Sequence, residues 1–181
     1  MIRRVAAQKR HLDKTAGSED FLLFSWGDYF ELENVRWGGL RFFNDDLVHP
    51  GCGFPVHLHE HIEVVTIVLA GEVRQKQGTQ SSVRLRSGDV QVLSAGTGVR
   101  HTETNECPSP AHFYQIGIFP RESGSVPSHT ESTFGALPVP NELLAVASGQ
   151  GKAGAIPMNA DATVYTGSLE PYHMINYVLG P

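Results

Sequence analysis

Short apolar runs separated by turn residues recur along the first 120 residues of the chain. Val, Ile, Leu and Phe dominate these runs, and Gly, Pro, Asn or Asp lie between them. The chain contains 19 Gly and 11 Pro, and convincing amphipathic helices are absent from its pattern. We expect strands within the ranges 21–30, 40–48, 62–71, 72–78, 82–88, 90–96, 99–105 and 112–120. Strands spaced by about ten residues favour an all-β antiparallel sandwich or barrel.

The pattern changes after residue 120. Residues 121–140 are polar and rich in Ser and Pro, which predicts a linker. Strand-like runs return within 142–148, 162–169 and 173–179. We therefore expect a barrel domain in residues 1–120, a linker in 121–140, and a last region, 141–181, whose strands pack on the barrel or on a second subunit.

Composition and charge narrow the function classes. The chain carries 14 Lys and Arg against 19 Asp and Glu, and its net charge of -5 argues against a nucleic-acid partner. Cys52 and Cys107 are too few for a disulfide framework, which favours a reduced, cytoplasmic location. The sequence shows neither a signal-peptide pattern nor the ~20 consecutive apolar residues that span a bilayer, so we expect no membrane partner.

Candidate chemistry is concentrated in two short stretches about forty residues apart. His57 and His59 stand at alternate positions, as do His101 and Glu103. If both stretches are extended, each pair points to one face of its strand. Two such strands facing each other inside a barrel would bring three imidazoles and one carboxylate together. This set suits Fe(II), Mn(II), Ni(II), Cu(II) or Zn(II) and leaves coordination positions open for a ligand.

Two neighbouring residues leave alternatives open. In an ideal strand His61 would share a face with His57 and His59, so it competes as a metal ligand or forms a contact at the rim. Glu63 begins an apolar run, where it either orients a histidine or forms a structural salt bridge.

The same residues resemble the two motifs of the cupin superfamily. The first motif corresponds to Gly51, His57, His59, Glu63 and Gly71. The second corresponds to Gly88, Gly96, His101 and Asn105, with Ser94 in the usual proline position. Residues 20–120 as a whole are similar to the pirin family, including the stretch "LRFFNDDLVHPGCGF" before the first motif.

The resemblance implies a cupin barrel, a double-stranded β-helix of jelly-roll type, that binds one metal ion. By this resemblance the ligands are His57, His59, His101 and Glu103, and Fe(II) is the first expectation for the metal. Glu63 is a ligand in many other cupins but not in pirins. Pirins usually have two stacked barrels, so the end of this chain resembles part of a second cupin barrel.

The resemblance also implies two classes of function. Some bacterial pirins are quercetin 2,3-dioxygenases, which open a flavonol ring with O₂, and we expect this activity on a flavonol or a similar aromatic substrate. Glu103 is then the first candidate to accept the proton of the flavonol hydroxyl, and Glu63 is the second. The alternative is a metal-dependent regulatory protein that modulates a transcription factor or a metabolic enzyme.

We expect a homodimer, because the apolar runs after residue 140 need a surface to cover them; the alternative is that they fold back on their own barrel.

Overall fold

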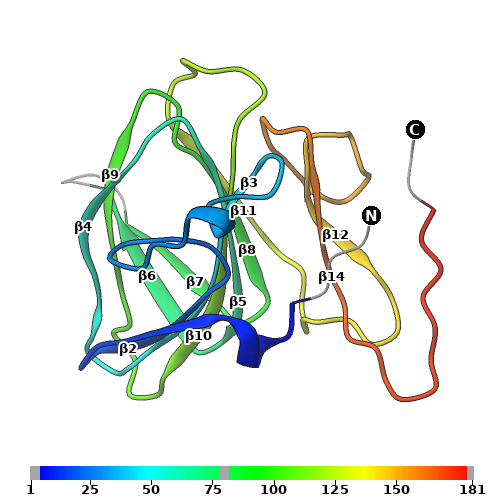
Figure 1. Cartoon of the computed structure of the whole chain (residues 1–181), viewed down its shortest axis with the longest axis horizontal. Coiled ribbons are helices and arrows are strands. Elements are labelled where there is room, and N and C mark those ends of the chain that lie inside the picture. Colours follow the sequence, from blue (N-terminus) through cyan, green and yellow to red (C-terminus); the bar gives the residue numbers. More distant parts are fainter. Residues whose placement is uncertain (1–4, 78–81, 179–181) are drawn as a thin grey trace.

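A computed structural model describes residues 5–77 and 82–178, and the regular secondary structure of this part is almost entirely β-strand (Figure 1). The strands are β1 (His11–Lys14), β2 (Ser18–Leu22), β3 (Leu40–Val48), β4 (Gly53–His59), β5 (Glu63–Ala70), β6 (Glu72–Lys76), β7 (Ser82–Arg86), β8 (Asp89–Ser94), β9 (Val99–Thr104), β10 (Ala111–Ile118), β11 (Ser128–Thr133), β12 (Leu144–Ser148), β13 (Ile156–Pro157) and β14 (Thr163–Thr166). The described chain also has two 3₁₀ turns, η1 (Ala7–Lys9) before β1 and η2 (Leu32–Asn34) between β2 and β3. Neither turn approaches the length of a membrane-crossing helix, and the described chain holds no other candidate.

Two sheets face each other and form the barrel. The larger sheet has seven strands in the order β1-β2-β3-β10-β5-β8-β11, and the smaller has the order β4-β9-β6-β7. All pairings within these two sheets are antiparallel. The all-β barrel predicted from the spacing of the apolar runs is confirmed.

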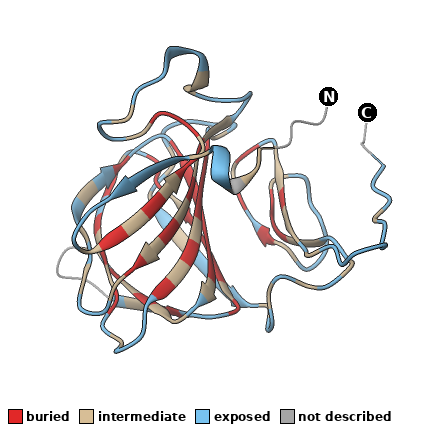
Figure 2. Cartoon of the chain, turned by 60° about the horizontal axis from the view of Figure 1, so that its bottom comes forward, coloured by how far each residue is buried: buried red, intermediate tan, exposed pale blue. Residues whose placement is uncertain are grey.

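The barrel interior has an apolar layer at each end and a polar layer between them. Along β2, β3 and β9, buried residues alternate with more exposed ones, whereas β5 and β8 are buried on both faces (Figure 2). One apolar layer consists of Phe42, Ile62, Val64, Leu93, Ala95 and Val99. The other consists of Val48, Val68, Val73, Leu85, Ala111 and Phe113. On β5, for example, Thr66 lies between Val64 of one layer and Val68 of the other, so a polar level remains at mid-height.

A third sheet, in the order β13-β12-β14, packs against the outside of the barrel (Figure 1). Its buried Val146, Ile156 and Val164 contact Val65 and Ile116 in one hydrophobic cluster. Burying an aliphatic side chain of this size stabilises a fold by about 1.5–3 kcal/mol. The runs at 142–148 and 162–169 thus fold back on their own barrel, which was the alternative to covering them with a second subunit.

Several segments differ from the expected elements, and β1 and β13 lie outside every expected strand range. The strand expected at 21–30 ends at Leu22, and Ser25 then holds an irregular loop through hydrogen bonds with Glu31. The part of 173–179 that is described, 173–178, contains no strand. The expected linker contains β11, which pairs with β8 at the sheet edge. Most of β11 is exposed on both faces, so its sequence lacks the apolar alternation that would have predicted it. The domain boundary at 121–140 stays a prediction.

Candidate metal centre

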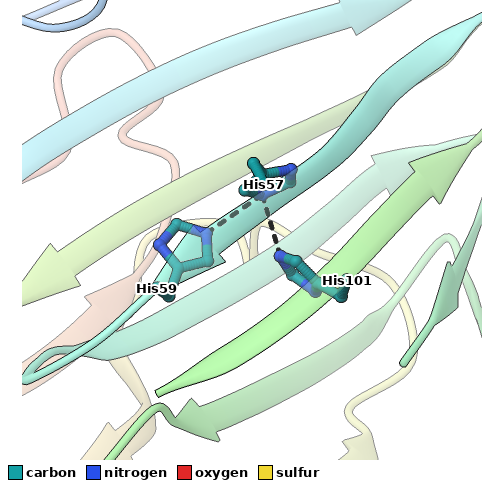
Figure 3. Close-up of side chains that lie close together, drawn as sticks. All are labelled: His57, His59 and His101. Carbon is teal, nitrogen blue, oxygen red and sulfur yellow. Dashed lines mark hydrogen bonds between the residues drawn. The ribbon is translucent and has the colours of Figure 1, made fainter. Parts of the chain in front are cut away.

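Three histidine side chains converge in the polar layer of the barrel. His57 and His59 extend from β4, and His101 extends from β9, directly opposite His57 in the strand pairing (Figure 3). The Nε2 atom of His57 lies 3.1 Å from Nε2 of His59 and 2.9 Å from Nε2 of His101. A ligand nitrogen of each ring lies within 4.8 Å of the other two. The structure therefore brings together the three histidines that the sequence predicted as ligands.

The backbone of β4 explains how residues so close in sequence reach this point. The pairing of β4 with β9 shifts register between Phe54 and His57, where one extra residue sits in β4. Such a bulge re-aims the side chains that follow it. Pro55 occupies the bulge, and it is tolerated because β4 is an edge strand. Gly53 allows the two strands to approach, since a Cβ atom there would lie 2.0 Å from the carbonyl oxygen of Glu103.

The protonation of the imidazoles suits metal binding. Burial lowers the pKa of both His59 and His101 to about 4, and the neighbouring His57 adds to this effect. At neutral pH both rings are therefore uncharged, as a metal ligand must be. The Nδ1 atom of His57 lies 2.9 Å from the carbonyl oxygen of Pro55, which only accepts. The ring proton of His57 is thus on Nδ1, and its Nε2 presents a lone pair.

The distances between the Nε2 atoms fit a common metal ion. Two nitrogens bound at about 2.0–2.1 Å and at right angles are about 2.9 Å apart. The separations of 2.9 and 3.1 Å match this value. Neutral imidazole suits Fe, Ni, Cu or Zn, so the donor set alone selects a transition metal and not its identity.

Glu103, the fourth expected ligand, lies beside the histidines. Its carboxylate is 1% exposed, and its Oε2 lies 3.9 Å from Nε2 of His57. Gln75 donates to Oε1 at 2.7 Å, while Gln115 Nε2 contacts Oε1 at 2.7 Å and Oε2 at 2.8 Å. The two amides hold the carboxylate in place next to the imidazoles. Glu103 as a ligand stays a prediction.

A cavity of about 360 Å³ opens beside this cluster. His57, His59 and Glu103 line it, together with apolar side chains that include Trp26 and Phe54. Its volume lies in the range of small-molecule sites, which combine mostly apolar walls with a few polar groups.

Two of the other candidates do not join the cluster. His61 has a φ of 53° and is exposed, because β4 ends at His59 and the strand alternation stops there. Glu63 points away from the cavity: its Oε2 accepts from the Ser94 hydroxyl at 2.7 Å and from the backbone N–H of Asn159 at 3.1 Å. This placement does not favour Glu63 as the second candidate for a catalytic proton acceptor, a role that stays a prediction.

Four polar residues of the site escaped the sequence reasoning: Asp20, Asn44, Asp46 and Gln75. Each stands on the inward face of its strand, in alternation with apolar residues such as Leu22 in β2 and Val73 in β6. The sequence signal that could have identified them is a polar residue at an inward position of an otherwise apolar strand.

Comparison with known proteins shows the family to which this chain belongs. The model of the Pirin family matches residues 4–118. The chain belongs to the pirin family. This pirin is 34% identical over 178 residues to the Pirin-like protein of Caulobacter vibrioides, covering 95% of this chain and 77% of the relative. It is 32% identical over 147 residues to the quercetin 2,3-dioxygenase of Escherichia coli K12, covering 81% of this chain and 62% of the relative.

Solved pirin structures share the fold. The bacterial pirin YhhW from Escherichia coli in complex with nickel(II) has 30% sequence identity and a TM-score of 0.80. The match covers 88% of this chain and 68% of YhhW. The protein YhaK from Escherichia coli is similar at a TM-score of 0.62 and 20% identity, which concerns the fold alone. The cupin barrel implied by the sequence motifs is thereby confirmed.

Proposed function

We propose that this pirin is a metal-dependent dioxygenase of the quercetin 2,3-dioxygenase type, which opens a flavonol or a similar aromatic ring with O₂. The observation that carries the proposal is the set of three converging imidazoles beside a cavity of about 360 Å³. Relatives named quercetin 2,3-dioxygenase and a pirin solved with nickel(II) support it. Fe(II) is our first choice for the metal, with Ni(II), Mn(II), Cu(II) and Zn(II) as the alternatives.

The residues of the chain have distinct roles in this proposal. His57, His59, His101 and Glu103 would hold the ion, which when bound acidifies a coordinated hydroxyl group and leaves open positions for substrate. Glu103 Oε2 faces the histidines, so it is placed to take the proton of a flavonol hydroxyl. Gln75 and Gln115 keep the carboxylate oriented, and Trp26 and Phe54 provide apolar surface that excludes water.

The test is O₂ uptake with quercetin, on protein loaded in turn with Fe(II), Mn(II), Ni(II), Cu(II) and Zn(II). We expect uptake matched by loss of the flavonol absorbance with at least one redox-active metal. His61→Asn, which leaves the cluster intact, serves as the control, because Asn tolerates the positive φ of this position. Loss of substrate that does not depend on any metal would contradict the proposal.

A second candidate function is a regulatory or binding role. The segment 169–178 favours it, because Leu169, Tyr172, Met174 and Val178 are all exposed. Apolar residues gathered on one surface often mark a protein contact. We propose a homodimer or a protein partner at this segment, within a cytoplasmic setting that suits the free Cys52 and Cys107. Light scattering at micromolar concentration should give twice the mass of one chain, and Met174→Asp with Val178→Asp should reduce it to one.

A further inference from the structure

Strands β2 and β3 contribute a second polar group to the cavity, which the metal centre does not use. Asp20 and Asp46 are directly paired across these strands, and Asn44 lies on the same inward face of β3 as Asp46. Their exposed fractions are 8% for Asp20, 5% for Asn44 and 1% for Asp46. All three line the cavity that also contains His57 and His59.

The hydrogen bonding of this group is incomplete. Asp20 accepts one hydrogen bond, from the Ser18 hydroxyl to Oδ2 at 2.9 Å. Three of the buried oxygens that find no partner in the described part of the chain belong to residues that line this cavity: Asp20 Oδ1, Asn44 Oδ1 and Asp46 Oδ2. Buried side-chain oxygens are nearly always hydrogen-bonded. Three unpaired oxygens along one cavity wall therefore indicate that a ligand with hydrogen-bond donors completes them.

The charged residues around this wall do not neutralise it. Arg10 pairs with Asp45, the neighbour of Asp46 that points outward, at 2.9 Å. Arg41 donates instead to the backbone carbonyls of Ser25 and Val35. Burial raises the pKa of Asp20 to about 6, and burial together with nearby carboxylates raises that of Asp46 well above its ordinary range. At neutral pH the carboxyl of Asp46 is therefore protonated and both donates and accepts, whereas Asp20 is mostly ionised and only accepts. A hydroxyl group suits both, and an anion does not.

The remaining surface of the cavity indicates what kind of molecule carries those hydroxyls. Leu22, Trp26 and Phe54 line the same cavity as Asp20 and Asp46. A hydrated cation gains little from such apolar and aromatic walls, whereas a flat aromatic ring buries its faces against them. The combination of apolar walls with unpaired oxygens is therefore complementary to a ring with several hydroxyl groups.

We propose that Asp20, Asn44 and Asp46 form a hydroxyl-recognition subsite, which binds the phenolic hydroxyl groups of a polyhydroxylated aromatic ligand at the end remote from the metal. This proposal rests on the proposed function, in which the other end of the same ligand binds the metal. The phenolic O–H groups donate to unpaired oxygens of this set, so these residues position the ligand and select for hydroxylated rings. They reject rings that carry a carboxylate or sulfate at that end, because such groups would place a second negative charge beside the Asp20 carboxylate.

The test measures equilibrium binding without turnover, in Zn(II)-loaded protein under anaerobic conditions. Titration followed by tryptophan fluorescence compares quercetin, whose distal ring carries two hydroxyls, with the flavonol whose distal ring carries none. We expect quercetin to bind at least tenfold more tightly to the parent protein. Asp46→Leu should reduce this preference to less than threefold, while the affinity for the unsubstituted flavonol and the zinc content stay unchanged.

Asp45→Asn is the matched control, because it alters the adjacent carboxylate that points outward, and it should keep the full preference. Asp46→Asn retains a hydrogen-bonding group of the same size, and it should restore part of the preference. Equal affinities of the parent protein for the two flavonols would overturn the proposal without any variant. Binding of a second zinc ion that Asp46→Asn abolishes would also overturn it, because the wall would then be a cation site.

The outcomes separate this subsite from the proposed function. A tenfold preference without O₂ uptake would leave the subsite standing and remove the dioxygenase assignment. O₂ uptake with equal affinities would leave the dioxygenase and remove the subsite.

Discussion

Glu103 and Asp46 are two carboxyl groups buried to the same degree in one cavity, yet their surroundings are opposite. Glu103 extends from the four-stranded sheet and has hydrogen-bond contacts from two amide groups, Gln75 and Gln115. Asp46 extends from the seven-stranded sheet and has another carboxyl, Asp20, directly across from it. Burying a charge is costly unless donors or opposite charges compensate it. The two carboxyl groups therefore differ in their hydrogen-bond donors and not in their burial. The wall that contains Glu103 suits a cation, and the wall that contains Asp46 suits a neutral ligand.

The largest expected effect is on the metal side of this contrast. His101→Ala removes one of the three converging imidazoles, and we expect the metal content to fall from about one ion per chain to almost none. Elemental analysis of protein made without an affinity tag measures it. His61→Asn should keep its metal, because His61 lies outside the cluster. Full metal content in His101→Ala would mean that the site is elsewhere.

The second effect separates two glutamates. Glu103→Gln keeps the shape of the side chain but removes its charge, so we expect metal affinity to fall by about 10–100-fold. Glu63→Gln should retain the parent affinity, because Glu63 bonds to Ser94 and Asn159 away from the cavity. Competition with a chelator at pH 7 measures both constants. The reverse ranking would mean that Glu63 and not Glu103 is the ligand.

The third effect concerns Asp46, on the wall opposite the metal ligands, where a substitution is expected to raise stability. The raised pKa of Asp46 means that the folded protein holds a proton that the unfolded chain releases above pH of about 4. The free energy of unfolding therefore loses this contribution as the pH rises. Asp46→Asn has no such proton, so its stability relative to the parent should grow from pH 5 to pH 8.

Urea unfolding of metal-free protein at the two pH values measures this difference. The lowered pKa values of His59 and His101 affect both proteins equally, because their stabilising effect as the pH rises is common to parent and variant. An advantage of Asp46→Asn that shrinks between pH 5 and pH 8 would contradict the contrast.

The smallest effect tests the donors themselves. Gln75→Leu removes one amide from Glu103 but leaves Gln115 in contact with both carboxylate oxygens. We expect metal affinity to fall by about tenfold or less, and Gln115→Leu to weaken it further. Isothermal titration with Zn(II) measures the ranking. Equal effects of the two substitutions would mean that the carboxylate is not held in the way the hydrogen bonds indicate.

The sequence predicted the barrel and its three histidines because both depend on strict alternation. His57 and His59, like His101 and Glu103, are two positions apart, and this spacing alone places each pair on one face of its strand. The bulge that precedes His57 was not predictable from this spacing. The positions of His61 and β11 were harder to predict. The positive φ of His61 ends the strand alternation there, and β11 is exposed on both faces, so its sequence shows no apolar alternation. Asp46 could not be assigned a role, since its pairing with Asp20 depends on which strand lies beside β3. That neighbour is a property of the topology and not of the local pattern.

The long sequence separation between the residues that meet in the barrel has a consequence for how the protein acquires its metal. His57 and His101 are 44 positions apart in the chain, and the Glu63–Asn159 bond joins residues 96 positions apart. Contacts at such separations form late and slowly, because long loops must close before any of them is made. We therefore expect the ion to enter a barrel that has already folded. Refolding rates should then be the same with and without metal, and metal should slow unfolding alone.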